Sequence, residues 1–180
     1  MAGRLRRRFL VAAAASLVLP RAMHAQPSHV VQRDGFRATV RTLGYNQAAS
    51  FYVARRLPNQ VVKQYAGACV ILVSAQNALA DTTISLRLAD WRVRTEGGGL
   101  QRIRGRSSWL AELDRQGAST ASRMAFEWAQ MPEEVDLGGG DSVQGMLSVP
   151  VARESPFELI LHWQSGLNRN EATIRGVRCD

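Results

Sequence analysis

Apolar residues alternate with polar ones along most of the chain, which is the period of a half-buried β-strand. Phe36, Ala38 and Val40 are the first clear case. The run at 68–73 is instead apolar at every position and rich in β-branched residues, so we expect a central strand with both faces buried. Further strands are predicted at 48–53, 84–88, 91–93, 124–128, 143–149, 157–163 and 172–179.

Two local features modify this pattern. The apolar residues of 84–88 are even-numbered, whereas those of 91–93 are odd-numbered. A bulge or a change of sheet is therefore expected between the two segments. One short helix is predicted at 107–116, where Trp109 and Leu113 share a face at helical spacing.

Seven or eight short strands separated by Gly and Pro, with one short helix in an insertion, favour an all-β fold, an antiparallel β-sandwich. No linker or repeat divides the chain. We expect a signal peptide at 1–25, a polar lead-in at 26–35 and a single β-sandwich domain at 36–180.

The expected signal peptide has three parts in the usual order. Arg4–Arg8 form a positive head, Phe9–Leu19 an apolar stretch too short to cross a bilayer, and Ala25 precedes the expected cleavage point, with Ala22 as the alternative. Arg6–Leu10 resembles the twin-arginine export signal, and the general secretory route stays open as well. The mature protein is therefore expected in the periplasm or outside the cell, with no transmembrane segment.

The two cysteines, Cys69 and Cys179, are expected to pair, because an exported protein reaches an oxidising compartment. The alternative is a pair of free thiols for redox or metal chemistry. That alternative is disfavoured, because the sequence has no CxxC motif and no histidine next to either cysteine.

The net charge of +8 is concentrated at the start of the chain. Five of the 23 lysines and arginines lie in the first 25 residues, which contain no acid, so the rest carries 18 basic and 15 acidic residues, a net charge of +3. A charge this small predicts no nucleic-acid partner.

Three segments resemble a known family. An apolar strand at 70–77 is followed by 84–93, which carries the step Ala89, Asp90, Trp91; a Gly-rich turn and alternating strand follow at 137–150, and another alternating strand at 157–161. Together they resemble the immunoglobulin-like β-sandwich of secreted bacterial proteins of unknown function, similar in fold to the mycobacterial immunoprotective extracellular protein. The insertion at 100–123 departs from that pattern. The resemblance implies a fold, an exported location and a binding role, and it supplies no catalytic residue.

The residues of the mature chain favour no catalytic or metal chemistry. Its two histidines, His29 and His162, are far apart, and no GxSxG elbow accompanies them. No tight cluster of ligands predicts a metal site, and no motif predicts a cofactor. An acidic cluster is interpreted as a solvated loop; it comprises Glu133, Glu134, Asp136 and Asp141.

A basic strand face is the main candidate binding feature. Arg92 and Arg94 should point to one side of a strand, opposite Trp91 and Val93. The candidate binding residues are Arg92, Arg94, Arg102, Arg104, Arg106 and Trp109, with Arg87 nearby in the sequence. The alternative is a face that is arginine-rich for solubility alone.

These observations predict an exported, non-catalytic binding module of the bacterial envelope, with an envelope protein or an anionic surface polymer as its partner. One alternative is a small hydrolase using carboxylates near residues 127–141, namely Glu127, Glu133, Glu134 and Asp136. Another is a structural subunit of an envelope complex, which an exposed apolar patch around Trp109 or Trp128 would favour.

Overall fold

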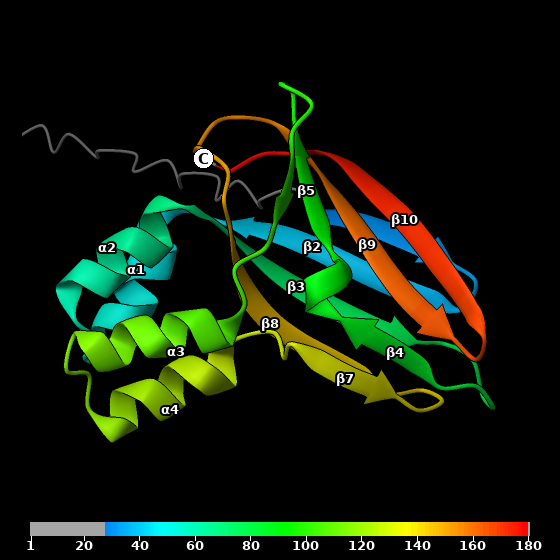
Figure 1. Cartoon of the computed structure of the whole chain (residues 1–180), viewed down its shortest axis with the longest axis horizontal. Helices are drawn as coiled ribbons and strands as arrows, with labels where there is room; N and C mark the ends of the chain where they lie inside the picture. The colour runs from blue at the N-terminus through cyan, green and yellow to red at the C-terminus, as the bar shows by residue number, and fades with distance from the viewer. Residues whose placement is uncertain (1–27, 180) are drawn as a thin grey trace, which may run out of the picture.

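The computed structural model describes residues 28–179 and contains two antiparallel sheets packed face to face, with helices at one end (Figure 1). The first sheet has the order β1-β2-β3-β8, with β1 (Ser28–Arg33), β2 (Phe36–Leu43), β3 (Cys69–Asn77) and β8 (Ser142–Val149). The second has the order β6-β5-β9-β4-β7, and β10 pairs with β9. Its strands are β4 (Ile84–Arg87), β5 (Arg92–Thr95), β6 (Leu100–Arg102), β7 (Glu134–Leu137), β9 (Phe157–Ser165) and β10 (Asn168–Val177). A fold dominated by antiparallel β-sheet is therefore confirmed; the expected signal peptide lies outside the described residues.

Alternating side chains fill the space between the sheets. Phe36 of β2 stacks on Trp163 of β9, with ring centroids 4.5 Å apart. Ile71 and Val73 of β3 are buried in the same cluster as Leu159 of β9. The alternation in the sequence thus reflects one face of each sheet packed against the other.

The strand β3 is buried on both faces, as its composition predicted. It pairs with β2 on one side and β8 on the other. Its inward residues join the core between the sheets, whereas Val70 and Leu72 point to the outer side and pack in a second apolar cluster.

Four helices lie at one end of the sheets (Figure 1) and supply most of that second cluster, which also contains Val70 and Met146 of the first sheet. They are α1 (Tyr45–Val53), α2 (Asn59–Gly67), α3 (Arg106–Arg115) and α4 (Thr120–Ala129). Tyr52, Tyr65 and Phe126 pack together with ring centroids 5.0 to 5.3 Å apart. The predicted helix at 107–116 is confirmed as α3, but the expectation of a single helix is wrong.

The strand predicted at 48–53 is wrong, because this segment lies in α1. Tyr45, Ala48 and Tyr52 recur at intervals of three and four, and this spacing turns Ala48 and Tyr52 onto the buried side of a helix. With α2, the segment packs on the sandwich through the second cluster.

The strand predicted at 124–128 is also wrong, because these residues lie in α4. The Ser119 side chain accepts a hydrogen bond from the Ser122 N–H and caps the helix. Only Phe126 of the three apolar residues is buried; Met124 and Trp128 are exposed on the opposite side.

Two segments expected to be irregular contain strands. The lead-in forms β1, which pairs with β2 over its whole length from Ser28 to Arg33. The acidic segment expected to be a solvated loop forms β7, which pairs with β4.

The predicted disulfide between Cys69 and Cys179 is confirmed. It joins the start of β3 in the first sheet to the residues after β10 in the second. Because the bond closes a loop of 110 residues, the chain-entropy model assigns it about 4 to 5 kcal/mol of stabilisation.

The segment after α4 crosses β8 at very short range. The Met131 N–H donates to the Met146 carbonyl at 3.0 Å, and Gln130 forms a parallel bridge with Met146. A Cβ atom at Gly145 would lie 2.1 Å from the Met131 nitrogen. Only glycine therefore fits at position 145.

We predict that Gly145→Ala pushes the 130–131 segment away from β8, because the new methyl group would overlap the Met131 backbone. The free energy of unfolding should fall by about 1 to 3 kcal/mol or more. Urea unfolding would measure it. Gly99→Ala is the matched control, because a Cβ at Gly99 meets no atom within 4 Å. Equal stability of the two variants would contradict the crossing.

Candidate functional site

A shallow groove with a volume of about 330 Å³ lies on the outer side of the second sheet. We call it the arginine groove. Its lining residues are Ser85, Arg87, Asp90, Arg92, His162, Trp163, Gln164, Arg169 and Asn170.

The groove lies where the hydrogen-bond ladder along β9 is interrupted. The strand β4 pairs with β9 at residues 163–165, and β5 pairs with it at residues 157–160. Between them the chain makes a short 3₁₀ turn, η1 (Leu88–Asp90). This turn causes the switch from even-numbered to odd-numbered buried residues between the two segments. The strands β4 and β5 remain in one sheet, so the predicted change of sheet is wrong.

A tryptophan side chain compensates for the missing ladder bond. The Trp91 Nε1–H donates to the His162 carbonyl at 2.9 Å, and the Trp91 ring is buried. The indole therefore holds the turn against β9 and positions the residues on either side of it.

Three guanidinium groups converge on the groove from separate strands. Arg87 is the last residue of β4, Arg92 the first of β5, and Arg169 lies on β10 opposite Gln164. The Arg92 Nη1 donates to the carbonyls of Ala89 at 2.6 Å and Trp91 at 2.7 Å, which orients this side chain. None of the three arginines forms a salt bridge within residues 28–179.

Negative charge around the groove is limited. Among residues 28–179, Asp90 is the one carboxylate in its lining. Glu171 lies 3.6 Å from the Nε2 of His162 across the β9–β10 pair, and Glu134 is opposite Arg87 in the register of β4 and β7. Guanidinium groups bind carboxylates and phosphates with two hydrogen bonds, so the lining is suited to an anionic group.

The structure separates the predicted binding residues. Arg92, and the neighbouring Arg87, line the groove. Arg94 lies on the same sheet and is paired with Glu158 at 2.9 Å, and the same carboxylate accepts a bond from Arg175. Arg102 is exposed on β6, opposite Arg92.

The rest of that set is used within the fold. The Arg104 guanidinium lies 3.8 Å from the Trp109 ring centroid and donates to the Ser108 carbonyl. Arg106 lies 3.8 Å from Glu127. Trp109 as a surface binding residue is a wrong expectation, because its side chain packs among the helices and the residue is only 4% exposed.

Sequence reasoning missed the contribution of β9 and β10. His162 and Gln164 point outward on β9, and Arg169 reaches them across the strand pair. The alternation of β9 predicts which of its side chains are exposed. The pairing of β10 with β9, which places Arg169 beside the groove, is not visible in the local pattern.

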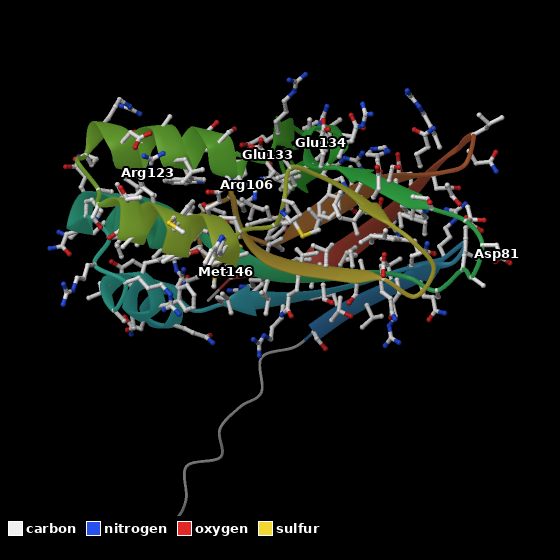
Figure 2. The ribbon with its side chains drawn as sticks, turned by 90° about the horizontal axis from the view of Figure 1, so that it is seen from below. Asp81, Arg106, Arg123, Glu133, Glu134 and Met146 are labelled. Atoms are coloured by element: carbon white, nitrogen blue, oxygen red, sulfur yellow. A yellow bond between two sulfur atoms is a disulfide. The ribbon has the colours of Figure 1, made fainter. Side chains whose placement is uncertain are left out.

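The carboxylates of the hydrolase alternative have separate structural surroundings. Glu133 caps the start of α3, accepting bonds from the Ser107 N–H at 3.0 Å and from its hydroxyl at 2.7 Å (Figure 2). Glu127 lies beside Arg106, and Glu134 and Asp136 are exposed on β7. None of them lines the groove. Within the described residues no group of three or more His, Cys, Asp or Glu is placed to hold a metal ion.

The helical layer contains a buried polar chain with shifted pKa values. Tyr65 donates to the Gln130 Oε1, the Gln130 amide donates to the Tyr52 oxygen, and Tyr52 donates to the Met146 sulfur. Burial raises the pKa of Tyr52 to about 12 and that of Tyr65 well above its usual value. All three polar side chains are satisfied and enclosed, which fits a role in packing the helices on the sheet.

No family model matches the chain, and no curated protein matches it. Among solved structures, a conserved hypothetical protein from Bacillus anthracis is similar at 12% sequence identity and a TM-score of 0.33, over 83% of this chain and 97% of that one. A likeness at this TM-score supports no inference about fold or function. No helix in residues 28–179 is long and apolar enough to cross a membrane.

We predict that Trp91→Phe leaves the His162 carbonyl without its partner and costs about 1 to 3 kcal/mol of stability. Urea unfolding measures the loss, and amide hydrogen exchange should accelerate at residues 88–92. Trp128→Phe makes the same chemical change at a residue that is 78% exposed and should be neutral. Unchanged exchange in Trp91→Phe would show that the indole does not hold the turn.

Proposed function

We propose that the protein is an exported, non-catalytic binding module of the bacterial envelope, and that its arginine groove binds anionic groups of an envelope partner or surface polymer. The observation that carries the proposal is the convergence of Arg87, Arg92 and Arg169 on one groove, without salt bridges in the described part of the chain. Guanidinium groups that form no salt bridge and lie on a concave surface attract anions and orient them by bidentate hydrogen bonds.

Other features support the exported location and the fold assignment. The pattern at 1–25 is that of a signal peptide, and the Cys69–Cys179 disulfide suits an oxidising compartment. Two antiparallel sheets packed face to face are compatible with the immunoglobulin-like family that the strand motifs resemble.

The expected result is that the purified protein binds a polyanion and that Arg87→Gln, Arg92→Gln and Arg169→Gln together weaken binding about 1,000-fold or more, because each charged hydrogen-bond donor contributes about 1.5 to 3 kcal/mol and every 1.4 kcal/mol is about tenfold in affinity. The probes are polyglutamate and polyphosphate, with dextran as the neutral polymer, and calorimetry measures the affinity.

A matched variant carries Arg37→Gln, Arg41→Gln and Arg56→Asn. It loses the same charge, but none of its residues lines the groove. Equal weakening by both variants would reduce the effect to overall charge and contradict a site in the groove. No binding of either polyanion would also contradict the proposal.

One specific observation supports a structural subunit as the second candidate. Trp128 is 78% exposed on α4, and Met124, one helical turn before it, is exposed as well. Large apolar side chains that remain in water often mark an interface between proteins. We expect Trp128→Gln to abolish retention of an envelope protein by the immobilised protein if this candidate is correct. Unchanged retention by Trp128→Gln, with loss in the groove variant, would exclude it.

A further inference from the structure

The first sheet and the helices beside it have an unusual distribution of charge. Residues 35–80 form β2, α1, α2 and β3 and contain no Asp or Glu. They contain five basic residues, which are Arg37, Arg41, Arg55, Arg56 and Lys63. The 15 acidic residues of the chain are therefore all found elsewhere.

The strand register extends this acid-free region over the part of the first sheet's outer face that the helices leave uncovered. On β2 the outward residues are Arg37, Thr39 and Arg41, since Phe36, Ala38 and Val40 are buried between the sheets. The residues paired with these three carry no carboxylate; they are Ser28, Val30 and Gln32 on β1 and Leu72, Ser74 and Gln76 on β3. The next strand, β8, adds Ser142 and Gln144 at the same positions, whereas Met146 is buried under the helices.

The cations of this face are available for an external partner. Within residues 28–179, Arg37, Arg41, Arg56 and Lys63 form no salt bridge. All four side chains are exposed. The face therefore presents positive charge that no carboxylate of the same surface neutralises.

Three large apolar side chains are exposed on β1 and α1, in the same part of the fold. Val53, at the end of α1, is 54% exposed and lies two residues before Arg55. Tyr45 at the start of α1 and Val30 on β1 are exposed as well. The Arg55 guanidinium stacks 3.5 Å from the Phe51 ring centroid, which places a cation directly against an aromatic side chain of α1. Such mixtures of basic, aromatic and aliphatic residues are typical of protein surfaces that lie on a lipid interface.

We propose that this acid-free face, formed by the outer side of the first sheet and α1, docks on an anionic phospholipid surface. The cations meet the lipid phosphates, while Val53 and Tyr45 enter the interfacial layer. A membrane fits better than a soluble polymer, because large apolar side chains are exposed on the same elements as the cations.

The docked orientation follows from the sandwich. Figure 2 shows β1 and β2 along the lower side of the molecule and β4 on the upper side. The arginine groove is built on the second sheet, so it faces away from the membrane and stays open to the aqueous phase.

Sedimentation with vesicles tests this docking. We expect the protein to bind vesicles of phosphatidylglycerol mixed with phosphatidylcholine and not vesicles of phosphatidylcholine alone. The variant with Arg37→Gln, Arg41→Gln and Arg56→Asn should bind roughly 100-fold more weakly, because each cation near an anionic bilayer strengthens binding about fivefold. Asn suits position 56, where φ is 57°.

The groove variant, with Arg87, Arg92 and Arg169 changed to Gln, is the matched control of equal charge and should keep its vesicle binding. Circular dichroism confirms that both variants are folded. Val53→Ser should weaken the vesicle binding that remains at high salt, because this part of the binding comes from the apolar side chains. A site that binds a soluble polyanion by charge alone would be unaffected by this substitution.

Three results would overturn the proposal: no binding to phosphatidylglycerol vesicles, equal weakening in both triple variants, or complete displacement by polyphosphate with no effect of Val53→Ser. The last would assign the face to a soluble polyanion. Groove function is measured on polyglutamate and polyphosphate with a different variant, so either hypothesis can fail while the other holds.

Discussion

The fold depends on one strand that is apolar on both faces. The inward residues of β3 pack against the second sheet, but Val70 and Leu72 on the outer face would otherwise meet water. Burying such a side chain stabilises a fold by about 1.5 to 3 kcal/mol. The four helices provide this burial, and the dependence is mutual. Each helix has only 9 or 10 residues, below the about 12 to 15 needed for an isolated helix to be even marginally stable in water.

This dependence explains which parts of the fold could be predicted. Where a strand buries one face against the other sheet, as β2 and β9 do, the period of two is direct evidence of structure. In α4, Met124, Phe126 and Trp128 imitate that period, although two of the three are exposed. The informative signals were the Ser119 cap and the buried positions Ser122 and Phe126, which are four residues apart. A list of apolar residues cannot separate these cases without knowing which of them are covered.

The candidate site was also predictable only where its residues lie on a single strand. Local alternation correctly placed Arg92 and Arg94 opposite the buried Trp91 and Val93. It could not show that Arg104 would be held against Trp109, because that contact depends on how α3 packs. Nor could it bring Arg169 to the groove, since this needs the register of two strands joined by a hairpin. Residues on one strand face follow from the pattern, whereas neighbours from different strands follow only from pairing.

On the outer side of the second sheet some arginines form salt bridges within residues 28–179 and others do not, and the difference depends on which residue of β9 faces them. Near the start of β9, Glu158 lies between β5 and β10 and accepts bonds from both Arg94 and Arg175, which neutralises part of that region. At the 3₁₀ turn the outward position on β9 is His162, so no carboxylate of that strand faces Arg87 and Arg92. Backbone carbonyls of the turn orient Arg92 instead, leaving its remaining donors free of a carboxylate partner. A guanidinium ordered during folding loses less conformational entropy when it binds an anion than a freely moving one does. The interruption of the ladder therefore creates the concave surface, and the histidine at the facing position of β9 leaves Arg87 and Arg92 without a carboxylate from that strand.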